Sequence, residues 1–221
     1  MDYQKGEKMI RIGGTNVDGW EAAIRGMRNP MNSWDKSDSG WREEFDETGT
    51  SAYFYKVGDA DLNLMKRLVK AGTDHSKFMR MINVSMDITA PLYWWKEFDT
   101  YKVGPVRNSC STMHKIHAKE FSLDDFSTDR LGLRSVKVLQ TVIKELNENR
   151  NEFLITKEKF FWWQMIQLLP SSYNQTATIQ LNYAVLRNMY RSRKAHKLDE
   201  WKVFCKWVET LPYSELITME V

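Results

Sequence analysis

Apolar and polar residues alternate over residues 80–88, and this alternation is typical of a strand with one buried face. The inward positions are Ile82, Val84, Met86 and Ile88. The next residues, Thr89-Ala90-Pro91, offer a capping hydroxyl and a proline suited to the first turn of a helix. The pattern therefore predicts a helix directly after the strand. Its apolar face is predicted to carry Trp94, Phe98 and Tyr101, at spacings of four and three residues.

The rest of the chain shows mostly helical periodicity. Apolar residues spaced by three and four predict helices over 18–27, 59–71, 130–149, 160–169, 177–193 and 199–209. A short strand is predicted over 9–12, ended by Gly13-Gly14. Residues 29–58 are mostly Asn, Ser, Asp, Gly and Glu, which predicts a long polar loop that is either functional or a surface insertion. Many helices around few strands indicate the α+β class.

Composition narrows the class of protein. The 221 residues are 42% hydrophobic and 13% aromatic, which predicts one globular domain and excludes a disordered chain. The 32 basic and 29 acidic residues are too balanced for a dedicated polyanion binder. Two cysteines form no disulfide framework and suit a reducing compartment. Without a long apolar run or an apolar leader near the start, the chain is predicted to be cytoplasmic.

Two groups of residues could carry chemistry on their own. Cys110 near His114 and His117 could be a nucleophile, and the two histidines could bind a metal if they lie on one helix. A plain loop cysteine is the commoner case, and no third metal ligand stands at a matching spacing. Basic residues gather in 187–197 and could bind a nucleic acid, although a solvated helix end favoured by its own dipole is the commoner explanation.

The order and spacing of residues 75–115 resemble the central segment of flavin-dependent thymidylate synthases. In that family a strand leads through Ala-Pro into a helix ending in Arg-His-Arg, and a Ser-rich loop then closes with Ser-x-Arg-Tyr. Aligned without gaps, Ala90-Pro91 takes the place of the turn, Thr100-Tyr101-Lys102 that of Arg-His-Arg, and residues 110–113 that of Ser-x-Arg-Tyr. Leu168-Leu169-Pro170 and the helix after it resemble the family's C-terminal run. The resemblance implies a single domain over 1–221, with helices around a small, mainly antiparallel sheet.

The resemblance also implies a set of site residues. Those at flavin-contacting positions are His75, Lys102, Asn182 and Asn188, and those at substrate positions are Glu97 and Arg193. Arg193 falls where the family holds the nucleotide phosphate, and Glu97 where it has a glutamine. Asn182, Leu186, Met189 and Arg193 are predicted to share one stripe of the helix 177–193. No catalytic residue and no metal ligand are assigned.

The family reaction transfers the methylene of methylenetetrahydrofolate to C5 of dUMP and reduces it with hydride from FAD, which NADPH regenerates. The resemblance therefore implies FAD as cofactor and dUMP, methylenetetrahydrofolate and NADPH as partners. It also implies a homotetramer whose active sites combine residues from several chains. The helix with Trp94, Trp95 and Phe98 is expected at the tetramer interface.

The departures from the family pattern leave two interpretations open. Thr100 and Tyr101 are neutral, and Thr112 replaces the loop arginine that would stabilise charge on the uracil. Either Lys96, Arg107 or Lys115 compensates for the missing charge, or the protein binds a related nucleotide without thymidylate synthase turnover. A nucleic-acid-binding protein using the basic residues of 187–197 is the third hypothesis.

Overall fold

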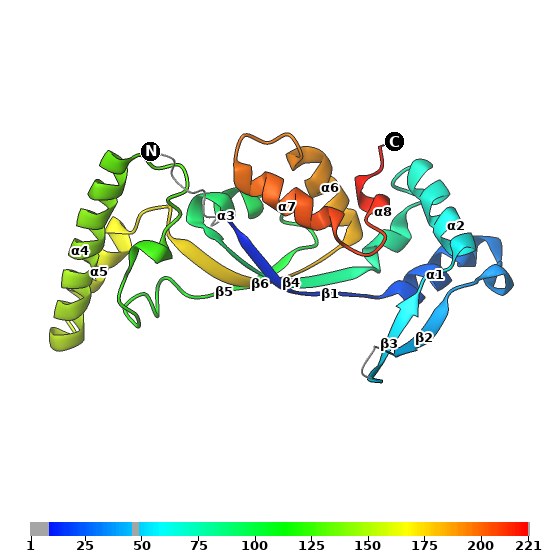
Figure 1. Cartoon of the computed structure of the whole chain (residues 1–221), viewed down its shortest axis with the longest axis horizontal. Coiled ribbons are helices and arrows are strands. Elements are labelled where there is room, and N and C mark those ends of the chain that lie inside the picture. The colour runs from blue at the N-terminus through cyan, green and yellow to red at the C-terminus, as the bar shows by residue number, and fades with distance from the viewer. Residues whose placement is uncertain (1–8, 46–48, 221) are drawn as a thin grey trace. The chain divides into compact units, whose positions relative to one another are not determined.

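A computed structural model describes residues 9–45 and 49–220, which form two compact units (Figure 1). The first unit contains residues 9–13, 86–103 and 107–179, and the second unit contains the other described residues. Four strands form a sheet in the order β1-β4-β6-β5. They are β1 (Arg11–Asp18), β4 (Asn83–Pro91), β5 (Val106–Ser109) and β6 (Asn174–Asn182). The α+β class is therefore confirmed.

The two inner strands, β4 and β6, form an antiparallel pair. The Thr178 hydroxyl donates to the Asp87 carboxylate at 2.6 Å, and the hydroxyls of Thr89 and Thr176 are 2.7 Å apart. Residue numbers therefore increase along β4 as they decrease along β6, which is the pattern of an antiparallel pair. Both strands alternate between buried and open positions. The buried set in β4 is Val84, Met86, Ile88 and Ala90, and in β6 it is Gln175, Ala177, Ile179 and Leu181. The predicted strand is confirmed, three residues later at each end than predicted, and its predicted inward residues are all buried. The small antiparallel sheet is also confirmed.

The predicted helix over 177–193 is wrong. Its first part belongs to β6, and only Tyr183–Arg193 is helical, as α6. Ala177, Ile179 and Leu181 alternate with period two, and pairing with β4 makes use of that alternation. Asn182 ends the strand and caps α6, so it is not part of a helical stripe.

The polar stretch 29–58 is more ordered than a loop. It contains two 3₁₀ turns, Asn29–Met31 and Trp34–Lys36, and the antiparallel hairpin of β2 (Gly40–Phe45) and β3 (Ser51–Lys56). Trp41 faces Tyr55 in this hairpin. The aromatic residues Trp41, Phe45 and Tyr53-Phe54-Tyr55, of a type favoured in strands, were the signal for these strands. The predicted strand 9–12 also differs, because β1 continues through both glycines to Asp18.

The first unit packs two helices, α4 (Leu133–Thr156) and α5 (Lys159–Leu168), side by side (Figure 1). A 3₁₀ turn, Leu123–Asp125, precedes them. Their core consists of Ile116, Phe121, Phe126, Leu139, Ile143, Leu146 and Met165. α4 begins three residues later than predicted and ends later, and α5 matches the predicted helix within one residue at each end.

The short helix α3 (Leu92–Phe98) also lies in the first unit. Pro91 is its N-cap, without the predicted threonine cap, and the predicted inward residues Trp94 and Phe98 are buried. Tyr101 lies beyond the helix end and is only half-buried. Trp94, Trp95 and Phe98 are at most 2% exposed within one chain. They therefore offer no surface to a neighbouring subunit, and their expected role in an interface is wrong.

The second unit contains α1 (Trp20–Arg28), α2 (Asp59–Lys70), the 3₁₀ turn Lys77–Arg80, α6, α7 (Asp199–Glu209) and α8 (Glu215–Thr218). α6, α7 and α8 lie together (Figure 1). The predicted helices 59–71 and 199–209 are confirmed, whereas α8 and β5 were not predicted. Among the described residues, no helix is long and apolar enough to cross a membrane.

Candidate functional site

Asn182 lies at the junction between β6 and α6. Its Oδ1 accepts a hydrogen bond from the backbone N–H of Val185 at 3.1 Å, which caps the helix. Gly104, two residues after Lys102 in the chain, lies against the same helical turn. Gly104 has φ +98°, and a Cβ there would lie 2.6 Å from Val185 Cγ2, so only glycine fits. The Asn182 side chain is therefore held in place, with its amide nitrogen left available for a ligand.

The remaining predicted residues of α6 do not share one face with Asn182. Leu186 and Met189 are fully buried, so the predicted stripe points into the core. Asn188 is exposed. Arg193 closes the helix, with its guanidinium carbon 4.7 Å from the ring centroid of Trp201 in α7. Asn182 and Arg193 lie at opposite ends of a helix about 16 Å long, too far apart for one phosphate group to contact both.

The segment after α3 shows how positive charge is retained near the position of the family's Arg-His-Arg. Lys102 is exposed and Glu97 is half-buried. Arg107 of β5 stacks on Trp95, with its guanidinium carbon 4.7 Å from the ring centroid, and its Nη2 lies 3.2 Å from the Asp99 carboxylate. Its Nη1 is buried and has no hydrogen-bond partner among the residues that the structure describes. Of the three cations considered as compensation, Arg107 thus has a fixed position and an unused donor.

His75 lies in the turn after α2, where its backbone N–H donates to Gly72 O at 3.2 Å and its side chain is exposed. It belongs to the second unit with Asn182, Asn188 and Arg193, whereas Glu97 and Lys102 belong to the first. No pattern in the sequence indicated this division.

The thiol and metal hypotheses gain no support. Cys110 is exposed, and its backbone is bound to the sheet through Thr176 O at 2.9 Å and the Gln175 side chain at 2.6 Å. The ring of His117 packs on Phe153 at 4.9 Å. No group of three or more His, Cys, Asp or Glu residues suited to a metal occurs within residues 9–45 and 49–220.

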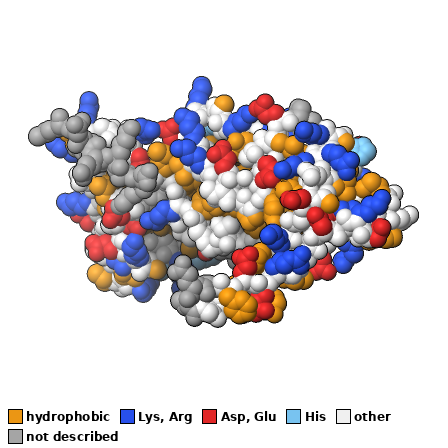
Figure 2. Space-filling view, turned by 45° about the vertical axis from the view of Figure 1, so that its right-hand side comes forward, with side chains coloured by type: hydrophobic (Ala, Val, Ile, Leu, Met, Phe, Trp, Pro, Cys, Tyr) orange, Lys and Arg blue, Asp and Glu red, His pale blue; other side chains and the backbone are white. Residues whose placement is uncertain are grey.

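The basic residues of 187–197 largely have partners within the second unit. Arg187 donates to the carbonyl oxygens of Leu216 and Ile217 at 3.0 Å, which holds α8 against α6. Lys194 pairs with Glu220 at 2.7 Å, in addition to the stacking of Arg193 on Trp201. On the face shown in Figure 2, basic and acidic side chains are interspersed. These observations favour local stabilisation over a polyanion-binding surface.

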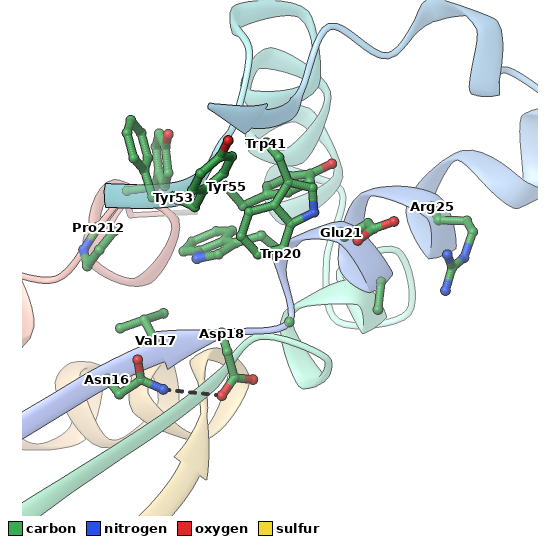
Figure 3. Close-up of a pocket in the computed structure, with 14 residues that line it drawn as sticks. Asn16, Val17, Asp18, Trp20, Glu21, Arg25, Trp41, Tyr53, Tyr55 and Pro212 are labelled. Atoms are coloured by element: carbon green, nitrogen blue, oxygen red, sulfur yellow. Dashed lines mark hydrogen bonds between the residues drawn. The ribbon is translucent and has the colours of Figure 1, made fainter. Parts of the chain in front are cut away.

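A cavity of about 940 Å³ lies in the second unit, between α1, the β2–β3 hairpin, the end of β1 and the turn at Pro212-Tyr213 (Figure 3). Its aromatic lining consists of Trp20, Trp41, Tyr53, Phe54, Tyr55 and Tyr213. None of the six site residues implied by the resemblance lines it. The aromatic residues within the stretch 29–58 were the sequence feature that could have indicated this cavity.

The polar groups of this cavity come from β1 and α1. Asn16 and Asp18 lie along one side in Figure 3, and Glu21 lies near the aromatic rings. Burial raises the pKa of Tyr55 above its ordinary value of 10.0, and the negative charge of Glu21 raises it further. The hydroxyl of Tyr55 therefore stays protonated near neutral pH and remains a hydrogen-bond donor.

Comparison with solved structures identifies the fold. No protein-family model matches the chain, and comparison with curated protein sequences finds no relative. A structure of thymidylate synthase X from Helicobacter pylori with FAD and dUMP matches with a TM-score of 0.69 and 16% identity, over 95% of this chain and 98% of that one. A second structure of the flavin-dependent enzyme from that organism, also with FAD and dUMP, gives 0.66 and 16%, over 96% and 98%. The chain therefore has the fold of flavin-dependent thymidylate synthases, as the sequence resemblance predicted.

Proposed function

We propose that this protein binds FAD and dUMP and acts as a flavin-dependent, thymidylate synthase-like enzyme. The observation that carries the proposal is the fold match, which extends over nearly the whole length of an enzyme whose two structures contain FAD and dUMP. Because fold alone does not fix activity, the residues must also suit these ligands.

The side chains of this chain suit a ligand with a polar ring and phosphate groups. Arg107 has a buried Nη1 without a partner among the described residues, which is costly unless a ligand accepts from it. Asn188 and the Nδ2 of Asn182 offer amide donors to ring carbonyls, and His75 offers an exposed imidazole. In the proposal His75, Asn182, Asn188 and Lys102 hold FAD, and Arg193 and Glu97 contact dUMP, with each site collecting residues from several chains of the assembly. FAD, when bound, supplies the hydride that reduces the transferred carbon.

A nucleotide-binding protein without turnover is the second candidate. Thr112 stands where the family has the arginine that stabilises charge on the uracil, and Thr100 and Tyr101 are neutral. The Asp99 carboxylate, 3.2 Å from Arg107 Nη2, also neutralises part of the Arg107 charge. In this case binding would persist and the methyl transfer would be lost.

Three measurements on the same purified protein separate these candidates. Titration of FAD into the apo-protein should quench the flavin fluorescence, and calorimetry should then detect dUMP binding. Formation of dTMP is next assayed with methylenetetrahydrofolate and NADPH. Binding with dTMP formation supports the enzyme, and binding without it supports the second candidate. A folded protein that binds neither FAD nor dUMP at millimolar concentration would contradict both.

The assembly state is a separate part of the proposal. A site that collects residues from several chains requires a homotetramer, and sedimentation velocity over a tenfold concentration range should show one. A concentration-independent monomer would contradict a composite site and with it the roles given to Lys102 and Arg193.

A further inference from the structure

The aromatic residues of the β2–β3 hairpin are open to a ligand. Trp41 is 60% exposed and Tyr53 is 69% exposed, although both line the cavity of about 940 Å³. Trp41 meets Tyr55 edge to face, with ring centroids 5.6 Å apart. Large exposed aromatic rings beside a cavity indicate a binding surface, because rings that serve only the core are covered.

The floor of the cavity, in contrast, is fixed by packing. Trp20 is 6% exposed and contacts Tyr213 and Tyr183 edge to face, with centroids 5.0 and 5.3 Å away. The Tyr183 hydroxyl donates to Pro212 O at 2.5 Å, which holds the turn that closes this side. Gly19 precedes Trp20 with φ +87°, and a Cβ there would lie 1.9 Å from Met81 O. A rigid aromatic floor under open aromatic rings suits a flat ligand.

Two opposite charges on α1 also line the cavity. Glu21 and Arg25 are exposed and lie four residues apart, and thus on one side of the helix. Their side chains have no ion-pair or hydrogen-bond partner within the described part of the chain. One helical turn raises Arg25 by about 6 Å above Glu21. A carboxylate accepts from paired N–H donors on a ring edge, and a guanidinium holds a phosphate.

We propose that this cavity is a ligand site for a guanine nucleotide. The base would stack on Trp41, its N1–H and 2-amino donors would reach Glu21, and its phosphate would reach Arg25. The volume lies within the range of about 300–1,000 Å³ typical of small-molecule sites. The proposal does not rest on FAD or dUMP binding, because none of the residues given to those ligands lines this cavity.

The test is calorimetric titration of GMP into the full chain without FAD or dUMP. Trp41→Ala should weaken GMP binding roughly five- to 150-fold, the range for loss of one base–aromatic stack, whereas Trp41→Phe should retain most of it. Trp34→Ala is the matched control, since Trp34 is 51% exposed and lies outside the cavity. Melting temperatures recorded alongside identify any variant that fails to fold.

The polar contacts are tested by paired ligands. Wild type should bind GMP about tenfold more tightly than IMP, which lacks the 2-amino group, and Glu21→Gln should remove this preference. Arg25→Gln should weaken GMP but not guanosine, and Arg67→Gln on α2 should change neither. The proposal is overturned if GMP does not bind at millimolar concentration. It is also overturned if Glu21→Gln and Arg25→Gln bind GMP and IMP as wild type does.

Discussion

The two arginines Arg25 and Arg28 lie three residues apart on α1 and have opposite surroundings. Arg28 is 4% exposed, with its Nε 2.6 Å from Asp61 and its terminal nitrogens donating to the carbonyls of Ser33 and Lys36 at 2.9 Å. Arg25 is exposed beside the cavity and has no such partners among the described residues.

Asp61 completes the buried arrangement. It is fully buried, and its second oxygen accepts from the hydroxyls of Ser37 and Ser39 at 2.6 Å. Burial by itself would raise the pKa of Asp61, but the hydrogen bonds from Ser37, Ser39 and Arg28 outweigh it and lower this pKa below its ordinary value. A charge with all its partners inside the chain therefore stabilises the fold, whereas an exposed charge beside a cavity is available to a ligand.

Breaking the buried pair of Arg28 and Asp61 should cause the greatest loss of stability. Arg28→Met leaves the Asp61 carboxylate buried without its counter-ion and should lower the free energy of unfolding by about 3–5 kcal/mol. Urea unfolding at pH 7 measures it. Arg25→Met is the control on the same helix and should stay within about 0.5 kcal/mol of wild type. Equal losses in the two variants would remove the distinction between buried and open charges.

Arg193 combines features of both cases, because it stacks on Trp201 and is also given a role in phosphate binding. Arg193→Ala should weaken dUMP binding by about 1.5–3 kcal/mol, the range for a charged hydrogen bond, and Arg193→Lys should restore only part of this. Calorimetry of dUMP binding measures the effect. Loss of the stack alone should lower stability by about 0.5–2 kcal/mol. An unchanged dUMP affinity with a lowered melting temperature would assign Arg193 to the fold.

The buried pair should also respond to acid. Because the pKa of Asp61 is lowered in the folded protein, its contribution to stability is present above the ordinary carboxyl value of about 3.9. This contribution is lost as the pH falls below that value. Urea midpoints from pH 7 to pH 3 should fall more steeply in wild type than in Asp61→Asn. Parallel curves would show that Asp61 contributes no pH dependence.

The smallest effect is expected at the open carboxylate. Glu21→Gln should leave the free energy of unfolding within about 0.5 kcal/mol of wild type. It should lower the pKa of Tyr55, although burial should keep that pKa above 10.0. Titration of carbon-13-labelled tyrosine by NMR follows the change. An unchanged Tyr55 pKa would place the carboxylate of Glu21 away from the ring hydroxyl.

Much of the fold was readable from the sequence because its signals are local. The alternation around Val84 predicted β4, and helical periodicity placed α7 at the observed bounds. The spacing of residues 75–115 carried the resemblance that the fold match supports. The failure at β6 has a specific cause. Its alternation was real, but the residues following Asn182 also fit a helical repeat, and only pairing with β4 decides where the strand ends.

The candidate sites depended on contacts between distant segments. Arg107 gains its fixed position from Asp99 and Trp95, and Asn182 becomes a helix cap because β6 ends there. The cavity joins Trp20, Trp41 and Tyr213, which come from three separate parts of the chain. Local sequence patterns identified the strand β4 and most of the helices with their buried faces, because residues a few positions apart decide these elements. Tertiary structure decided which charges are buried in pairs and which stay open, because burial and partners depend on residues that only folding brings together.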